Sequence, residues 1–270
     1  MDAAMIPAAR GPRIPAPAPS VEEALFELAL RLGDDGLILG HRLSEWCGHA
    51  PMLEEDLALP NMGLDLLGQA RALYALAGEI EGKGRGEDDF AYHREERAFR
   101  NCLLAERPNG DFACTMLRQL IFAAHAAPFW QATEASVDPR LAAIAAKASK
   151  EMRYHVRHAA EWVIRMGDGT KESAARMAAA ADALAPYADE LFETDAATAT
   201  LVAAGVIPDP AKIRPEWDRT MDEVFAEARL PRPTPRFAQS GGRRGIHTED
   251  LGHLLAPLQY LARAHPGAKW

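Results

Sequence analysis

Apolar residues recur at helical spacing along most of the chain beyond residue 20, and no segment alternates convincingly between apolar and polar residues as a strand does. Leu25, Leu28 and Leu32 are one example of this spacing. Clusters of Gly, Pro and Asp separate the helical segments from one another. The sequence therefore predicts an all-α fold.

The same signals place the individual helices. The run 33–36, Gly-Asp-Asp-Gly, is expected to interrupt the first helical segment. Asp111, Asp138 and Thr248 are expected to cap the helices that follow them. We expect helices over residues 21–32, 37–49, 63–79, 90–106, 112–133, 139–166, 171–194, 196–204, 216–228 and 248–264, with an earlier start left open for the helix over 63–79.

Length and composition predict one well-packed domain. A chain of 270 residues with 48% hydrophobic and 26% charged residues can bury a full core. We expect this domain over residues 21–270, with a C-terminal extension from about residue 208, where prolines become frequent. Residues 1–20 are rich in Pro and Ala and lack the apolar core of a secretory signal, so we expect a disordered arm.

Charge and cysteine content exclude several classes of function. The formal net charge of -9 argues against nonspecific nucleic-acid binding, because phosphate contacts need clustered Lys and Arg. The three cysteines show no CxxC spacing, which indicates neither a disulfide framework nor a zinc cluster and favours a cytoplasmic location. No stretch approaches the roughly twenty apolar residues that cross a bilayer, so no membrane association is expected.

Two long helical segments, 63–79 and 139–166, carry incomplete versions of a metal-ligand pattern. In four-helix proteins with a carboxylate-bridged di-iron centre, two helices each supply one Glu and the other two each supply Glu-x-x-His. The i, i+3 spacing directs both groups of such a pair into the bundle core. The chain contains no Glu-x-x-His. We therefore expect a site without its metal that keeps polar remnants.

The first candidates for these remnants lie in the N-terminal third. Glu45 could be the lone carboxylate of a first bundle helix, although an ion pair within its own helix is the simpler interpretation. Asp65 and Gln69 stand where a carboxylate-x-x-His pair is expected. Neither register completes the pair, because Gly68 follows Asp65 at the His position and Leu66 precedes Gln69 at the acid position.

Other candidates lie further along the chain. Glu151 and His155 are separated by four residues, and Met152 stands three residues before His155, so a hydrogen bond on one helix face is the simpler interpretation. His125 lies among apolar residues and is expected to be a core histidine rather than a ligand. The run 250–253, Asp-Leu-Gly-His, has the right spacing but no second copy, and we assign it no role.

Buried charges that have no metal must pair with one another or with amides, because leaving one unpaired costs several kcal/mol. A polar network is therefore expected where the metal would be. Its candidate members are Glu45, Asp65, Gln69, His125, Glu151 and His155.

Residues 241–245, Gly-Gly-Arg-Arg-Gly, are expected to form a flexible basic turn before the last helix. Arg243 and Arg244, together with free backbone N–H groups, could contact an anion such as a phosphate of a nucleotide-bearing substrate. A solvated turn or a contact with another subunit is the alternative. No nucleophile elbow, Walker loop or dinucleotide-binding glycine motif occurs in the chain.

Several long runs resemble the C-subunit family of bacterial ring-1,2-phenylacetyl-CoA epoxidases. The first two are 39–51, LGHRLSEWCGHAP, and 61–71, NMGLDLLGQAR. The others are 106–113, 150–155, 167–170, 242–249 and 266–270. The resemblance covers the whole chain except the proline-rich arm.

This resemblance implies a ferritin-like four-helix bundle with additional helices and a C-terminal helical extension. It also implies a non-catalytic subunit of a multicomponent monooxygenase that epoxidises the ring of phenylacetyl-CoA in aerobic phenylacetate breakdown. In this family the di-iron centre lies in the catalytic A subunit, and the C subunit shares its fold and scaffolds it. Alignment with the two Glu-x-x-His motifs of the A subunit pairs Leu66 with Gln69 and Met152 with His155, so only His155 is retained.

The implied partners are the A subunit, a small B subunit and a reductase that carries FAD, an iron–sulfur cluster and NADPH, with no cofactor in this chain. The outer faces of the first helices and the C-terminal segment from Pro208 are the expected docking surfaces, because they are long and expose apolar residues.

Two rival hypotheses stay open. One is an independent di-metal oxidase that uses Glu45, Asp65, His125, Glu151 and His155, and the other is a regulatory protein that binds a CoA ligand through Arg243 and Arg244.

Overall fold

The computed structural model describes residues 17–268, and no β-strand occurs among them. The α-helices are α1 (Val21–Ser44), α2 (Leu53–Glu81), α3 (Glu87–Tyr92), α4 (Leu103–Glu106), α5 (Phe112–Thr133), α6 (Pro139–Gly167), α7 (Lys171–Leu184), α8 (Ala196–Ala203), α9 (Pro210–Glu227) and α10 (Glu249–Ala264). The 3₁₀ helices are η1 (Glu96–Ala98), η2 (Ala185–Tyr187), η3 (Asp189–Phe192) and η4 (Gly242–Arg244). The predicted all-α class is confirmed. The predicted disordered arm lies mainly outside the described residues.

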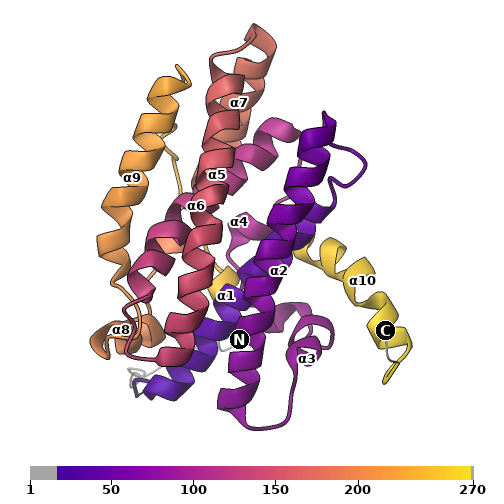
Figure 1. The fold of residues 1–270 in the computed structure, drawn as a ribbon, viewed down its shortest axis with the longest axis vertical. Helices are drawn as coiled ribbons and strands as arrows, with labels where there is room; N and C mark the ends of the chain where they lie inside the picture. Colours follow the sequence, from indigo (N-terminus) through magenta and orange to yellow (C-terminus); the bar gives the residue numbers. More distant parts are fainter. Residues whose placement is uncertain (1–16, 269–270) are drawn as a thin grey trace, which may run out of the picture.

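Four long helices, α1, α2, α5 and α6, form the central bundle (Figure 1). α1 packs along α2, α5 packs along α6, and α2 also contacts α6. α7 and α9 pack against α5, whereas α8 packs against α1. Figure 1 shows α9 and α10 on opposite sides of this bundle. No helix of the described residues is both long enough and apolar enough to cross a bilayer.

Local signals fix most helix ends where the sequence predicts them. Asp111 accepts a hydrogen bond from the backbone N–H of Cys114 at 3.0 Å, and Asp138 caps α6 in the same manner. The predicted caps at Asp111 and Asp138 are therefore confirmed. Thr248 occupies the N-cap position of α10, but its hydroxyl donates to Oε1 of Glu106 at 2.8 Å instead of capping the helix, so that predicted side-chain cap is wrong. Ser20 and Glu23 form a capping box at the start of α1.

The predicted helix break at residues 33–36 is wrong, because α1 is continuous through them. A Cβ atom at Gly36 would lie 2.7 Å from the carbonyl oxygen of Leu66, and one at Gly33 would lie 2.7 Å from the ring of Tyr74. The glycines are needed here because α2 approaches the backbone of α1 too closely for any side chain. They permit helix packing instead of ending a helix.

Two prolines lie inside helices that the sequence predicts to begin after them. α2 begins at Leu53 and contains Pro60, and α9 begins at Pro210 and contains Pro215. Leu59 and Ile213, which lie close to these prolines, are 0% and 4% exposed. Tertiary packing of the apolar side chains thus overrides the local cost of proline.

The predicted helix over residues 90–106 is also wrong. The chain forms α3, η1 and α4 there, with extended residues between them. Asp34 accepts a hydrogen bond from the backbone N–H of Arg100 at 2.6 Å, and Asp35 accepts one from that of Cys102 at 2.7 Å. Backbone donors that a helix would use internally are bound to α1 instead. Similarly, α7 ends at Leu184, and η2 and η3 replace the predicted helix up to residue 194.

Candidate functional site

Three polar side chains from three different bundle helices meet between α2, α5 and α6. His155 of α6 is fully buried, and its Nε2 atom lies 3.2 Å from Oδ2 of Asp65 on α2. Its Nδ1 atom lies 3.0 Å from Nε2 of Gln119 on α5. In this arrangement the amide of Gln119 donates to Nδ1, and the imidazole donates from Nε2 to the carboxylate. The predicted residues Asp65 and His155 are thus brought together, whereas Gln119 is a residue that the sequence did not single out.

Glu151 and Gln69 form a second contact between α6 and α2. The amide of Gln69 donates to Oε2 of Glu151 at 2.8 Å, and Oε1 of Glu151 lies 3.4 Å from Nζ of Lys147. Glu151 therefore pairs across the helices with Gln69 and along its own helix with Lys147. Glu151 hydrogen-bonds to Gln69, and His155 contacts Asp65. The predicted hydrogen bond between Glu151 and His155 is therefore wrong.

Glu45 is not in the bundle core. α1 ends at Ser44, so Glu45 occupies the C-cap position and its side chain is 44% exposed. The carboxylate accepts hydrogen bonds from Arg42 and from the amide of Asn109, each at 2.9 Å. The core placement of Glu45 is corrected, and the simpler interpretation as an ion pair within its own segment is confirmed.

His125 lies on α5 away from the His155 contacts. Its ring stacks on Phe129, with centroids 6.0 Å apart, and meets the edge of Phe192 at 5.0 Å. Burial and the nearby charge of Arg243 lower the pKa of His125 to about 3, so its ring is neutral at physiological pH. This placement agrees with a core histidine rather than a metal ligand.

The groups around His155 include few of the ligands that a di-iron centre uses. Leu66 and Met152, which the resemblance to the A subunit would place at acid positions, are fully buried apolar side chains. The remaining donors include two amides, from Gln69 and Gln119, whereas such a centre uses about four carboxylates and two imidazoles. Across residues 17–268, no three His, Cys, Asp or Glu side chains gather as a possible metal site.

The structure reveals two buried acids in the run that the sequence predicts to be a helix break. Asp34 is fully buried, forms an ion pair with Arg94 and accepts a hydrogen bond from Oη of Tyr74 at 2.5 Å. Burial, together with the charge of Asp34, holds the pKa of Tyr74 well above its ordinary value, so the phenol stays protonated and donates. Arg94 also contacts the ring of Phe99, 4.3 Å from its centroid.

Asp35 binds the C-terminal segment. Its Oδ2 atom lies 2.8 Å from Nη2 of Arg243, and the side chains of Asp35 and Arg243 are 3% and 13% exposed. The predicted flexible turn at residues 241–245 is therefore wrong, because it contains η4 and a buried ion pair. Arg243 is occupied by Asp35, and of the two predicted anion-contact residues only Arg244 is exposed, 3.5 Å from Glu193.

Two further buried acids, Glu190 and Glu106, form hydrogen bonds with the C-terminal segment at residues 241–248. Oε1 of Glu190 accepts from the backbone N–H groups of Gly241 and Gly242, each at 2.8 Å. Glu106 accepts from the N–H of Thr248 at 2.7 Å and contacts Nδ1 of His247 at 2.8 Å. In the sequence, the apolar residues beside these acids could have indicated that they are buried, because a buried acid must have a buried partner.

One more cross-helix pair joins α2 to α6. Nε2 of His158 lies 2.9 Å from Oε2 of Glu55, and their side chains are 13% and 7% exposed. Glu55 lies in the part of α2 that the sequence did not predict as helix. The α2–α6 contact is thus held by polar pairs along its length, and each buried charge in these pairs has a partner.

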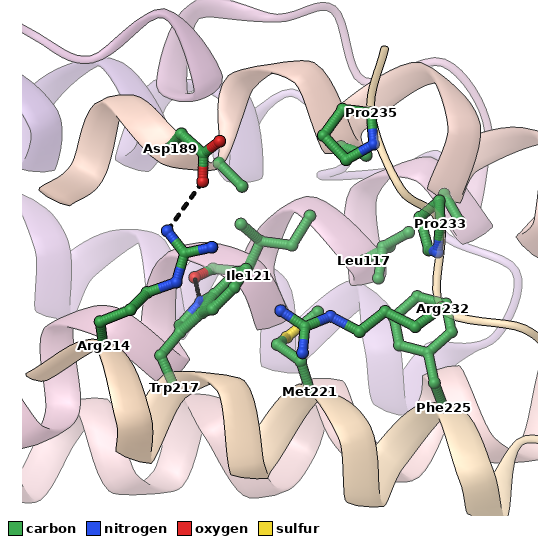
Figure 2. A pocket seen from close by; sticks show the side chains of 13 residues that line it. Leu117, Ile121, Asp189, Arg214, Trp217, Met221, Phe225, Arg232, Pro233 and Pro235 are labelled. Carbon is green, nitrogen blue, oxygen red and sulfur yellow. Dashed lines mark hydrogen bonds and ion pairs between the residues drawn. The ribbon is translucent and has the colours of Figure 1, made fainter. Parts of the chain in front are cut away.

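A pocket lies between α5, α9 and the proline-rich segment that follows α9 (Figure 2). Its apolar lining includes Leu117, Ile121, Trp217, Met221, Phe225, Pro233 and Pro235. Arg214 and Arg232 also line it, but Asp189 lies 2.7 Å from Arg214 and Asp218 lies 2.5 Å from Arg232. The pocket offers apolar surface, and both of its guanidinium groups already have carboxylate partners.

The family model described as "Phenylacetic acid catabolic protein" matches residues 14–270. The C subunit of the 1,2-phenylacetyl-CoA epoxidase of Escherichia coli (strain K12) is 49% identical to this chain over 250 residues. That alignment covers 91% of this chain and 99% of the relative.

Proposed function

Because this chain belongs to the phenylacetic acid catabolic protein family, we propose that it is the structural C subunit of a phenylacetyl-CoA ring 1,2-epoxidase in aerobic phenylacetate catabolism. In this role it has no di-iron site of its own and supports a catalytic A subunit. The small B subunit and the reductase are its further partners. The di-iron centre belongs to the A subunit, and the FAD, iron–sulfur cluster and NADPH belong to the reductase.

The observation that carries the proposal is the composition of the bundle core. Leu66 and Met152 are fully buried at two positions where a di-iron site of this architecture requires acids. Gln69 and Gln119 supply amides that hydrogen-bond to Glu151 and His155. These contacts join α6 to α2 and α5 through protein groups, although Oε1 of Gln119 has no hydrogen-bond partner among residues 17–268. A rigid bundle of this kind is suited to supporting another subunit.

The two rival functions have less support. An independent di-metal oxidase would need Glu45 in the core, yet Glu45 lies at the end of α1 beside Arg42 and Asn109. A CoA-binding regulator would need Arg243 to be available, yet Arg243 is buried against Asp35.

Metal content of the chain purified alone tests the proposal. We would express it in iron-supplemented medium, purify it without chelators and measure bound metal by elemental mass spectrometry. The expected result is iron near zero per chain. A value near two irons per chain would overturn the proposal and make Asp65, Glu151 and His155 the ligands to mutate first.

The activity of the assembled complex tests whether this chain contributes residues to catalysis. His155→Gln keeps a polar group that can bond to both neighbours of the imidazole, and a structural subunit should tolerate it. We expect kcat for phenylacetyl-CoA epoxidation by the complex to change by less than about twofold, because a residue that stabilises no transition state leaves kcat unaltered. A loss of 100-fold or more, on the order of what removing an active-site group costs, in a complex that still assembles would contradict a non-catalytic role.

A further inference from the structure

The outward side of α2 carries a ridge of exposed leucines. Leu53, Leu57 and Leu64 are 70%, 60% and 64% exposed, and their spacing of four and seven residues places them on one side of the helix. α1 packs against a different side of α2, where Leu66 and Gly63 face it. Single exposed leucines are ordinary on protein surfaces, but several along one stripe indicate a contact site. In Figure 1 no other helix crosses in front of α2.

α6 adds an aromatic residue and a basic row beside this ridge. Tyr154 is 41% exposed, and Lys147, Lys150, Arg153 and Arg157 are all exposed within eleven positions. Lys147 pairs with Glu151, but among residues 17–268 neither Lys150 nor Arg153 forms an ion pair. This row is unusual in a chain whose formal net charge is -9.

The ridge and the basic row lie on neighbouring helices, because hydrogen bonds join α2 to α6 between them. Gln69 of α2 donates to Glu151 of α6, and Asp65 of α2 contacts His155 of α6. We call this surface the α2–α6 face. It consists of Leu53, Leu57, Leu64, Lys150, Arg153, Tyr154 and Arg157.

We propose that the α2–α6 face is the docking surface for the catalytic A subunit, and that the contacting surface of that partner is helical, with an apolar seam flanked by carboxylates. The inference rests on the proposed function and adds the location and chemistry of the interface. A leucine ridge fits into the groove between two helices. Unpaired Lys and Arg beside it require acidic residues opposite. A second copy of this chain is a poorer occupant, since it would bring two basic rows into one interface.

The two parts of the face have different roles in binding. Desolvation of the leucines and Tyr154 supplies affinity, so their loss increases the dissociation rate. The basic row steers the approach of an acidic partner, so its reversal slows association and reduces the dependence of association on salt. These two kinetic signatures separate apolar docking from charge steering.

The test is a binding measurement between the full chain and a purified A subunit, by surface plasmon resonance at two salt concentrations. Leu57→Glu combined with Leu64→Glu is expected to raise Kd by about 30-fold or more, as removal of a hot-spot residue does. Lys150→Glu combined with Arg157→Glu is expected to reduce the association rate about tenfold or more at low salt. Val137→Glu is the matched control, because Val137 is 68% exposed and lies between α5 and α6 away from this face. Circular dichroism checks that each variant is folded.

The possible results distinguish a wrong interface from a wrong function. If the wild-type chain binds the A subunit and the double variant Leu57→Glu with Leu64→Glu binds equally well, the α2–α6 face is not the interface, although the proposed function stands. If Tyr260→Glu on α10 abolishes binding instead, the C-terminal segment is the docking surface. If the wild-type chain alone is a dimer that Leu57→Glu converts to a monomer, a second copy covers the face. If the wild-type chain does not bind the A subunit at all, the proposed function itself fails.

Discussion

At the residue scale, Asp34 and Asp35 show how neighbouring residues on one helix can hold two distant parts of the chain. Successive helical side chains point about 100° apart, so the two carboxylates face different partners. Asp34 pairs with Arg94 and Asp35 pairs with Arg243. Each acid also accepts a backbone N–H from the irregular segment between η1 and α4. The irregular segment is therefore ordered by charges on α1.

Asp35→Asn should destabilise the fold strongly. The amide keeps the shape of the carboxylate but removes the charge, which leaves Arg243 buried without a counter-ion. The expected loss is about 3–5 kcal/mol in the free energy of unfolding, measured by urea titration. The control is Glu87→Gln, because Glu87 and Arg71 are 37% and 75% exposed and such pairs contribute about 1 kcal/mol at most. A loss no larger than that of the control would contradict the structural role of Asp35.

His125 should make the fold sensitive to acid. Its pKa is lowered to about 3 in the folded chain, whereas the ordinary value is 6.5. Between these values the unfolded chain binds a proton that the folded chain does not. Stability is therefore lost as the pH falls below about 6.5, with a slope of up to about 1.4 kcal/mol per pH unit.

The variant His125→Gln isolates this contribution, because glutamine stays neutral across the whole range. Urea midpoints at pH 7, 5.5 and 4.5 should fall less steeply for His125→Gln than for the wild-type chain. His93→Gln, at an exposed position, is the control and should keep the wild-type slope. Identical slopes in all three proteins would show that His125 takes up its proton in the folded state.

At the scale of elements, the packing of α1 on α2 depends on glycine. α1 runs unbroken through residues 33–36, and Gly33 and Gly36 lie where a Cβ would clash with the ring of Tyr74 and with the carbonyl oxygen of Leu66. Gly40 and Gly63 continue this close approach, since a Cβ at either would lie 3.0–3.1 Å from the other's carbonyl oxygen. The stripe of glycine thus sets the distance between two of the four bundle helices.

Gly36→Ala should weaken this helix pair. The new Cβ would lie 2.7 Å from the carbonyl oxygen of Leu66, and backbone cannot move aside cheaply. We expect a loss of about 1–3 kcal/mol in the free energy of unfolding by urea titration. Gly68→Ala on α2 is the matched control, because its nearest neighbour would be Nζ of Lys147 at 3.6 Å. That variant should be neutral or stabilising by up to about 1 kcal/mol, and equal losses in both would argue against steric exclusion.

At the scale of the whole molecule, buried acids join the C-terminal segment to the bundle. Glu190 holds Gly241 and Gly242, Glu106 holds Thr248, and Asp35 holds Arg243. These contacts connect η4 and the start of α10 to α1, α4 and η3. The single domain over residues 21–270 stays a prediction, and these contacts support it.

Hydrogen exchange should show that this segment opens together with the bundle. We expect the amides of Gly242 and Thr248 to have protection comparable to that of α1, because both bond to buried carboxylates. The measurement is native-state exchange read by mass spectrometry on peptides that cover residues 241–248 and 21–44. The loop at residues 82–86 is the internal reference for fast exchange. Fast exchange at 241–248 with a protected α1 would show that the C-terminal segment is a separate unit.

The sequence by itself determined the features that depend on local interactions. The all-α class follows from helical periodicity, and the starts of α5 and α6 follow from Asp111 and Asp138, whose side chains cap within three residues. The family followed from long runs of similar sequence, and the comparisons agree with it. The pairing of Asp65 with His155 was foreseen only as two members of one polar cluster.

Only the tertiary structure decided which polar groups meet. Asp35 and Arg243 are 208 residues apart, and no local pattern indicates that they pair. The run 33–36 has the composition of a turn, yet it is helical, and its two glycines lie where α2 leaves no room for a Cβ. Glu45 lies outside the bundle core, contrary to the prediction, because α1 ends one residue before it. Local propensity sets where helices can form. Burial of apolar side chains and the pairing of buried acids such as Asp34 and Asp35 decide where the helices end and which distant segments they contact.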